Sequence, residues 1–284
     1  MRLKVTHRTR YVYSSAVRES FNEARLQPTT NDHQTCENFL LRVLPAVRLK
    51  HYHDLYANIV HYFDIPATHD TLDVESAARV VTRPQQSPLD VEPWPLARVS
   101  ELHRHERCFD YTQPSHYVET SPEAWRLALD VTAGQTEVWR AAVTVMEHVH
   151  REFRYDSGAT NVHTHMAEVL TARRGVCQDF AHVMIGMLRA IGIPALYVSG
   201  YLYNGPRDQL LGAQASHAWC EIFLPGLGWR GLDPTNNQPA DERYIKIAVG
   251  RDYADVPPLR GHYKGTLERQ LEVAVLVERL DDSP

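Results

Sequence analysis

Cys177, His217 and Asp233 are the residue types that thiol-dependent acyl transfer requires. A cysteine becomes a nucleophile when a histidine takes the thiol proton and a carboxylate or amide fixes the tautomer of that histidine. Such residues are usually far apart in the sequence and meet only in the fold. These three are separated in the sequence as well, so the fold would have to bring them together. We therefore take Cys177, His217 and Asp233 as the candidate catalytic residues and ask which elements would bring them together.

The segment that follows Cys177 is predicted to be a buried helix that begins at the cysteine. Its apolar residues recur at steps of three and four, which is the spacing of one helical face, and Cys177 falls at the start of the same face. Unpaired backbone N–H groups and the positive end of the helix dipole at this point favour the thiolate. The alternative is that Cys177 is a small core residue. The periodic residues are Phe180, Val183, Met184, Met187, Leu188 and Ile191.

His217 and Asp233 are predicted to lie on two antiparallel strands joined by a hairpin. The glycines in residues 226–228 form the turn, and adjacent antiparallel strands can hold His217 beside Asp233. Alternation along the strand sends Cys220 to the face opposite His217 and Trp219, so Cys220 is predicted to be a core residue.

Two polar residues near Cys177 are predicted to have structural roles. His182 lies on another face of the same helix, about 7.5 Å along its axis, where it is expected to cap or pack rather than reach the sulfur. Asp179 stands in the first turn, where a carboxylate accepts hydrogen bonds from free backbone N–H groups.

Four His-x-His pairs raise zinc chemistry as the main alternative to a cysteine nucleophile. None of them comes with a Cys-x-x-Cys, an extended His-Glu-x-x-His or another closed ligand set, and no Asp-x-Asp-x-Asp-Gly run suggests calcium. We therefore predict no metal site and no cofactor. The pairs are His51 and His53, His103 and His105, His148 and His150, and His163 and His165.

The first part of the chain is predicted to be an antiparallel β domain, residues 1–83. In residues 3–13 a stripe of alternate residues that runs from Leu3 to Tyr13 is typical of a half-buried strand. Further strands are expected over residues 38–50, 58–65 and 71–81. Residues 84–120 are rich in proline and are predicted to cross between domains.

Residues 121–250 are predicted to form the domain that carries Cys177. Helices are expected over residues 121–131, with Ser121 as N-cap, and over 136–153 and 164–175, the last ending at two arginines and Gly175. Strands follow at 195–203, 216–225 and 228–234. In the C-terminal segment, residues 251–284, the alternating run 269–280 is expected to return as a strand to one of the sheets.

Composition excludes several classes of protein. The 284 residues carry a formal net charge of -5, which argues against a nucleic-acid partner. The N-terminus alternates polar and apolar residues and lacks the apolar core of a secretory signal, and no apolar run approaches the roughly 20 residues of a membrane span. Four cysteines in a chain without an export signal are expected to be reduced thiols, so we predict a cytoplasmic protein without a membrane partner.

Residues 173–202, "RRGVCQDFAHVMIGMLRAIGIPALYVSGYL", followed by "SHAWCEIFLPGLGWRGLDPTNN", resemble bacterial members of the transglutaminase-like superfamily. The Gly-x-Cys of that family falls on Gly175 and Cys177, its His-Ala-Trp begins at His217, and its Asp-Pro-Thr begins at Asp233. Residues 1–85 look similar to the β-rich N-terminal region of many bacterial members. Tyr56 and Ala57 stand there in place of an expected Phe-Gly, a departure that affects a turn.

The resemblance implies an α+β protein, in which an antiparallel β domain precedes a papain-related core with the nucleophile at a helix N-terminus, packed on an antiparallel sheet. It implies acyl transfer on a peptide or protein substrate: the Cys177 thiolate attacks an amide, His217 moves the proton and Asp233 orients His217. The Cys177 backbone N–H and Tyr155 are candidate oxyanion donors, and the alternative for Tyr155 is a buried side chain that tethers a loop. Trp219 and Trp229 are candidates for the walls of a substrate cleft, with core packing as the alternative.

Because hydrolysis and transfer to an amine share one thioester, the residues leave open a cysteine peptidase, an amidase or a transglutaminase. The alternative from another class is a non-catalytic protein-binding module that keeps the fold. Substrate preference and oligomeric state are not determined by these patterns.

Overall fold

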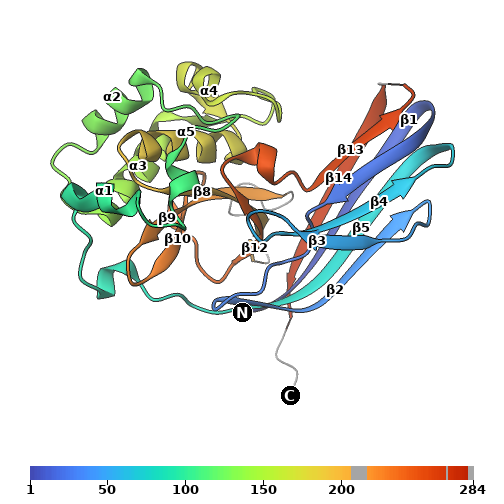
Figure 1. Cartoon of the computed structure of the whole chain (residues 1–284), viewed down its shortest axis with the longest axis horizontal. Coiled ribbons are helices and arrows are strands. Elements are labelled where there is room, and N and C mark those ends of the chain that lie inside the picture. The colour runs from blue at the N-terminus through green and yellow to red at the C-terminus, as the bar shows by residue number, and fades with distance from the viewer. Residues whose placement is uncertain (206–215, 267, 281–284) are drawn as a thin grey trace.

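The computed structural model describes residues 1–205, 216–266 and 268–280, and shows an α+β protein built from an antiparallel sheet and a mixed core (Figure 1). Residues 206–215 of the predicted core, and residues 267 and 281–284 of the predicted C-terminal segment, lie outside the described residues. The expected fold class, an antiparallel β region followed by a core with Cys177 at the start of a helix, is confirmed. The domain boundaries at residues 83, 120 and 250 stay a prediction.

The N-terminal sheet is organised around β1 (Arg2–Ala24). The first half of β1 pairs with β5 and β14, and the second half pairs with β4 and β13, while β2 pairs with β5 and β3 with β4. The returning C-terminal strand is β14, whose pairing with β1 begins at Leu3 and Arg279. The partner strands are β2 (Gln34–Leu44), β3 (Lys50–His53), β4 (Ile59–Ile65), β5 (His69–Thr82), β13 (Leu259–Lys264) and β14 (Arg269–Arg279).

Two predicted strands have different bounds in the structure. The strand expected over residues 38–50 is two strands, β2 and β3, because Pro45 has no N–H to donate to a ladder and follows the end of β2 directly. The strand expected over residues 3–13 extends to Ala24 as β1. The prediction stopped at Tyr13 because Ser14 and Ser15 interrupt the apolar alternation. The strand itself continues, since its register shifts between Val12 and Val17 and its second half pairs with other strands.

The turn after β3 contains the departure from the family pattern. Ala57 adopts a left-handed conformation with φ of 62°, the region that glycine fills most easily. Asp54 holds this turn, because its Oδ1 accepts hydrogen bonds from the backbone N–H groups of Tyr56 and Asn58, both at 3.0 Å. Asn58 in turn bonds both backbone groups of Val249 at 2.8 Å, so the turn ties the N-terminal sheet to the core.

The core packs helices against an antiparallel sheet with the strand order β11, β10, β9, β8, β12. The helices are α1 (Val99–Leu102), α2 (Pro122–Val131), α3 (Val138–Glu152), α4 (Met166–Ala172) and α5 (Cys177–Ala190). The strands are β8 (Ala195–Leu202), β9 (His217–Leu224), β10 (Gly228–Asp233), β11 (Gln238–Pro239) and β12 (Tyr244–Gly250), with a separate parallel pair, β6 (Arg154–Tyr155) and β7 (Arg174–Gly175). Ser121 caps α2 as expected, since its hydroxyl accepts from the Ala124 N–H at 3.2 Å.

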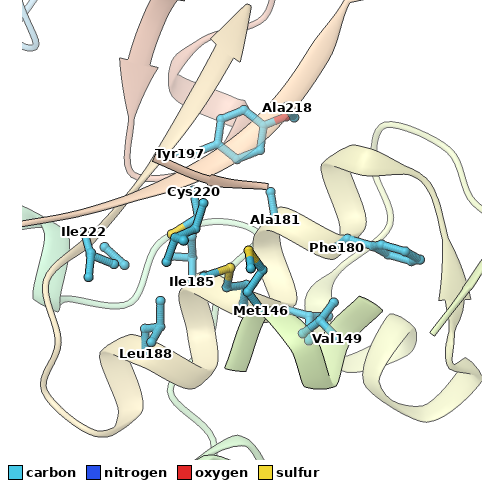
Figure 2. Packing of buried hydrophobic residues seen from close by; sticks show 14 of the residues in the cluster. Met146, Val149, Phe180, Ala181, Ile185, Leu188, Tyr197, Ala218, Cys220 and Ile222 are labelled. Carbon is cyan, nitrogen blue, oxygen red and sulfur yellow. The ribbon is translucent and has the colours of Figure 1, made fainter. Parts of the chain in front are cut away.

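The helix that begins at Cys177 is buried on every side, and not on one face as its apolar spacing indicated. All residues of α5 from Gln178 to Arg189 are buried, because α2, α3 and α4 pack on it from one side and β8 and β9 from the other. Figure 2 shows Ala218, Cys220 and Ile222 of β9 directed toward this helix. Cys220 is a core residue, as predicted. Because α5 is packed on all sides, Cys177 at its N-terminus is held in a defined position.

One face of the N-terminal sheet packs on the core. Leu3 and Val5 of β1 belong to the main apolar cluster, and His7 is buried with its Nδ1 at 2.7 Å from the hydroxyl of Tyr201 on β8. Burial lowers the pKa of His7 to about 4, so this histidine is neutral at physiological pH. The first residues of the alternating stripe predicted over residues 3–13 therefore pack the N-terminal sheet against the core.

Candidate active site

Cys177 is the first residue of α5, and the loop before it is held by Asp179. Asp179 Oδ2 accepts hydrogen bonds from the Val176 N–H at 2.8 Å and from Thr160 Oγ1 at 2.5 Å. The predicted role of Asp179 as a first-turn carboxylate is confirmed. The backbone N–H of Cys177 lies at the helix start, where no carbonyl of the preceding turn can accept it.

The sequence predicted that the preceding helix ends at Gly175, but α4 already ends at Ala172. The left-handed residue after α4 is Arg173, with φ of 52°, and Gly175 lies in the short strand β7. A Cβ at Gly175 would stand 2.5 Å from Asp179 Oδ2 and 2.8 Å from Asp179 Cβ. The glycine is therefore needed because the capping carboxylate occupies the space beside it.

His217 and Asp233 meet because β9 and β10 form an antiparallel hairpin. His217 is the first residue of β9 and Asp233 is the last of β10, so the two lie at the same end of the sheet. Their side chains are fully buried, with His217 Nε2 at 2.8 Å from Asp233 Oδ2. The structure thus places this pair as the sequence predicted.

The carboxylate of Asp233 accepts hydrogen bonds from several further donors. Its Oδ1 accepts from the backbone N–H groups of Thr235 at 2.8 Å and Asn236 at 3.3 Å. Its Oδ2 accepts from Asn236 Nδ2 at 2.7 Å and from the Tyr244 hydroxyl at 2.8 Å. Burial alone would raise the pKa of Asp233, but His217 and these donors hold it below its usual value. Asp233 is therefore an anion in the folded protein.

Sequence reasoning missed Asn236 and Tyr244. Asn236 follows the Asp-Pro-Thr run closely, and its side chain turns back to the carboxylate that precedes it. Tyr244 begins β12, a strand that pairs with β8 on the far side of β9, so no sequence spacing connects it with Asp233. The Tyr244 hydroxyl accepts from Gln238 Nε2 at 2.7 Å, which leaves its proton directed to Asp233.

The electrostatics of His217 favour the imidazolium. Burial lowers the pKa of His217, but the charge and hydrogen bond of Asp233, assisted by the Cys177 thiol, raise it to about 10. Since Nε2 is taken by Asp233, Nδ1 is the ring nitrogen available to the thiol. Nδ1 is buried and has no hydrogen bond of regular geometry to the described part of the chain. Catalytic contacts are often loose before substrate binds.

Trp219 fixes the orientation of the His217 ring. The two rings stack with centroids 6.2 Å apart and an interplanar angle of 29°. Space for the indole comes from the neighbouring strands, since a Cβ at Gly200 would stand 2.5 Å from Trp219 Cη2 and one at Gly231 would stand 3.3 Å from Trp219 Nε1. Trp219 and Trp229 line another cavity of about 540 Å³, so they do not wall the space at Cys177.

A cavity of about 230 Å³ opens at Cys177 and is also lined by His217, Tyr155, Ser216 and Tyr253. Cys177 is partly exposed, which distinguishes it from the buried Cys220. Sulfur and imidazole therefore face the same space, at the end of the sheet where the helix begins. This arrangement can carry out nucleophilic chemistry on a group that enters the cavity.

Tyr155 lies in the same cavity, on β6 beside β7. Burial, together with the nearby Cys177 and Asp179, raises the pKa of Tyr155 to about 12, so its hydroxyl keeps its proton at physiological pH. The edge of its ring contacts Phe180, with centroids 6.3 Å apart. Tyr155 is therefore held in the cavity wall with a donor group available.

His182 lies away from this chemistry. It is fully buried, its Nε2 accepts from the Tyr253 N–H at 3.2 Å, and its ring stacks on Tyr117 at 5.6 Å. Burial lowers the pKa of His182 to about 3, so the ring is neutral. The predicted packing role of His182 is confirmed.

The His-x-His pairs do not assemble into a metal site in the part of the chain that the structure describes. No group of three or more His, Cys, Asp or Glu side chains there is placed to hold a metal ion. Among these same residues, none of the helices has the length and apolar character to cross a membrane.

Comparison with known proteins places the chain in a family. The sequence profile of the transglutaminase-like superfamily matches residues 126–234, and that of the bacterial transglutaminase-like N-terminal region matches residues 3–81. The chain belongs to the transglutaminase-like superfamily. The first profile covers Cys177, His217 and Asp233, and the second covers most of the N-terminal sheet.

Relatives of this transglutaminase-like chain cover it over different lengths. An uncharacterized protein of Mycobacterium leprae is 36% identical over 282 residues, which are 98% of this chain and 99% of that protein. A protein-glutamine gamma-glutamyltransferase of Pseudomonas aeruginosa is 32% identical over 194 residues, 62% of this chain and 28% of that protein. The crystal structure of a candidate cysteine protease from Cytophaga hutchinsonii has a TM-score of 0.77 at 23% identity, covering 100% of this chain and 93% of that one, which shows a shared fold.

Proposed function

We propose that this transglutaminase-like protein catalyses cysteine-dependent acyl transfer on amides of a peptide or protein through a thioester. The observation that carries the proposal is the shared cavity, in which Cys177 at a helix start faces His217 while Asp233 holds the other ring nitrogen. Family membership and the names of the transferase relative and the protease-like structure support the same reaction class.

The first half of the reaction forms the thioester. His217 Nδ1 takes the thiol proton, and the Cys177 sulfur bonds to the carbonyl carbon of the substrate amide. Negative charge develops on the carbonyl oxygen, where the Cys177 backbone N–H and the Tyr155 hydroxyl are the candidate donors. The imidazolium then gives its proton to the leaving amine as the C–N bond breaks. Asp233 stabilises the imidazolium throughout.

The second half of the reaction releases the acyl group. Water or a substrate amine loses a proton to His217 and attacks the thioester carbon, the S–C bond breaks, and the thiolate regains its proton. Water gives a carboxylic acid, as in a peptidase or amidase, and an amine gives a new amide, as in a transglutaminase. We propose that the reaction takes place in the cytoplasm, which supplies the reducing environment that keeps a thiol nucleophile active.

The test is the alkylation of each cysteine by iodoacetamide at pH 6, followed by mass spectrometry. We expect Cys177 to react at least about ten times faster than Cys36, and substitution His217→Ala to remove the difference. Cys108 and Cys220 serve as internal controls, because burial raises the pKa of Cys108 to about 12 and raises that of Cys220 as well. Equal, slow alkylation of all four thiols would instead favour the non-catalytic binding module.

Turnover and the nature of the acyl acceptor are tested with a library of glutamine-containing peptides, with and without a primary amine, against Cys177→Ala. New amine-linked products indicate a transglutaminase, and shortened or deamidated peptides indicate a hydrolase. If the wild-type protein gives no product above the Cys177→Ala background, the enzymatic proposal fails.

A further inference from the structure

The cavity at Cys177 is too small to recognise a peptide by itself. Its volume of about 230 Å³ lies below the range of roughly 300–1,000 Å³ that is typical of sites that enclose a small ligand. It can accept the amide group under attack and little more. If the protein acts on peptides, the adjoining surface must bind the rest of the substrate.

A second cavity, of about 550 Å³, adjoins the first one. Tyr253 lines both cavities. Gln178, in the wall of the first, donates a hydrogen bond from Nε2 to the carbonyl of Val162, in the wall of the second, at 3.3 Å. The two spaces therefore share a wall at Tyr253, so the larger one is the neighbouring space for a peptide that extends from Cys177.

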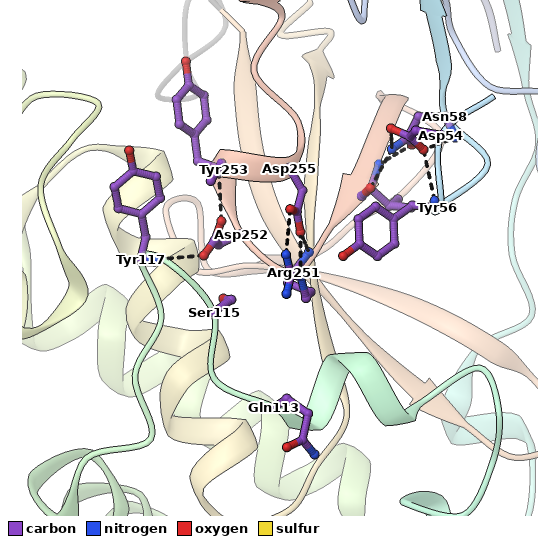
Figure 3. A network of polar contacts seen from close by, with 12 residues as sticks. Asp54, Tyr56, Asn58, Gln113, Ser115, Tyr117, Arg251, Asp252, Tyr253 and Asp255 are labelled. Carbon is purple, nitrogen blue, oxygen red and sulfur yellow. Dashed lines mark hydrogen bonds and ion pairs between the residues drawn. The ribbon is translucent and has the colours of Figure 1, made fainter. Parts of the chain in front are cut away.

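The larger cavity lies between the core and the N-terminal sheet, beyond the point where Leu3 and Val5 pack on the core. On the sheet side, β1, β13 and β14 line it, and Figure 1 shows these strands side by side. On the core side, Tyr117 and Tyr253 line it, and Figure 3 shows their two side chains extending in the same direction. We call this space the tyrosine groove. Its tyrosines are Tyr11, Tyr13, Tyr117, Tyr253 and Tyr263.

The aromatic side chains of the groove support an exposed guanidinium group. Arg269 lies over the rings of Tyr11 at 5.1 Å and Tyr263 at 5.7 Å, and it donates to the Tyr263 hydroxyl at 3.1 Å. Tyr13 contacts Tyr263 edge to face, with centroids 4.9 Å apart. These contacts hold Arg269 in place, so its side chain loses little further conformational freedom when a ligand binds.

The groove is positively charged, although the chain as a whole carries 35 acidic and 30 basic residues. Arg260 and Arg269 line it, and its lining among the described residues contains no Asp or Glu. The cross-strand neighbour of Arg260 is Glu23, which pairs instead with Arg25 at 3.4 Å. The buried carboxylate nearest in sequence to Tyr253 is Asp252, whose oxygens accept the N–H groups of Tyr117 at 2.7 Å and Ala254 at 2.8 Å.

We propose that the tyrosine groove binds an acidic stretch of the peptide substrate, next to the amide that is presented to Cys177. Carboxylates of that stretch pair with Arg260 and Arg269, since guanidinium groups bind carboxylates by directed hydrogen bonds, and the tyrosine rings pack on its apolar atoms. The proposal assigns the N-terminal sheet and the returning strands β13 and β14 to substrate selection. It rests on the proposed function for the reaction at Cys177, but not for the binding itself.

Binding is measured by fluorescence anisotropy on the full-length Cys177→Ala protein, so that the outcome does not depend on turnover. The probes are acetylated hexapeptides with a neutral fluorophore and one glutamine, flanked by Glu-Glu, Gln-Gln or Lys-Lys. We expect the Glu-Glu peptide to bind about fivefold or more tightly than the Gln-Gln peptide, and the preference to weaken as salt screens the exposed charges.

The decisive variant replaces Arg260 and Arg269 by Glu together, and it is expected to reverse the order so that the Lys-Lys peptide binds best. The matched control is Arg79→Glu, an exposed arginine on β5 of the same sheet, outside the groove lining. It should keep the acidic preference. Equal binding of the three peptides to the Cys177→Ala protein overturns the proposal. So does an acidic preference that survives the double substitution, or one that is lost to the same extent in Arg79→Glu. Acidic preference without turnover in the wild-type protein would refute the proposed reaction and leave the groove assignment intact.

Discussion

Substitution Asp233→Asn is expected to inactivate Cys177 while the fold is retained. The pKa of His217 is raised from 6.5 to about 10, so the site stabilises the imidazolium by roughly 5 kcal/mol relative to a histidine side chain in water. An amide removes that charge, and burial then lowers the pKa of His217 below its usual value. The imidazolium is no longer favoured beside Cys177 at neutral pH.

The hydrogen bonds around residue 233 predict the tautomer that would follow. If the amide NH₂ takes the place of Oδ2, it faces the donors His217, Tyr244 and Asn236. His217 Nε2 can then only accept, so the ring proton moves to Nδ1, the nitrogen needed to take the thiol proton. The hydrogen bond from Asn236 Nδ2 to residue 233 is also lost in this arrangement. We expect a loss of about 1–3 kcal/mol in unfolding free energy, because buried hydrogen bonds to a charged carboxylate are replaced by weaker ones to an amide.

The assay is the rate of iodoacetamide alkylation of Cys177 at pH 6, alongside thermal unfolding from pH 5 to pH 10. Alkylation should slow by about 10²-fold or more. A raised histidine pKa stabilises the folded state below pH 6.5 and ceases to do so as pH rises through about 10, so the difference in Tm between wild type and Asp233→Asn should shrink over that interval. Alkylation within about threefold of wild type, or a difference in Tm that grows with pH, would refute the assigned role of Asp233.

Two further substitutions test the surroundings of the thiol. Tyr155→Phe should lower kcat by about 10²-fold with little change in KM if the hydroxyl stabilises the oxyanion, whereas equal kcat in the variant would restrict Tyr155 to packing. Gly175→Ala should displace Asp179 from the start of α5, because the new Cβ would stand 2.5 Å from Asp179 Oδ2. We expect a loss of about 0.5–2 kcal/mol in unfolding free energy and slower alkylation of Cys177, and an unchanged Tm would contradict this reading of the glycine.

The parts of the site that lie within one helix or one hairpin could be predicted from the sequence. Cys177 and Asp179 belong to the first turn of α5, and the glycine-rich turn brings the strands of His217 and Asp233 together. In each case the spacing of nearby residues determines the geometry. The period of the apolar residues in α5 could not show how many elements surround it, because those elements, α2, α3 and α4 before it and β8 and β9 after it, come from other parts of the chain.

Contacts between distant strands could not be predicted in the same way. Tyr244 reaches Asp233 because β12 pairs with β8 at the opposite side of the sheet, and alternation within one strand carries no information on such pairing. The tyrosine groove likewise depends on β13 and β14 lying beside β1. The stripe from Leu3 to Tyr13 predicted a buried face, although it could not show that the face begins against the core and ends in a cavity.

The pairing of β14 with β1 means that the core is an insertion within a sheet assembled from both ends of the described chain. A protease cut between β12 and β13 would therefore leave two pieces still joined by the ladders that β13 and β14 form with β1. Such a nicked protein should remain one particle until that pairing melts. The two pieces, expressed separately, should then associate into the whole molecule when β13 and β14 of one piece pair with β1 of the other.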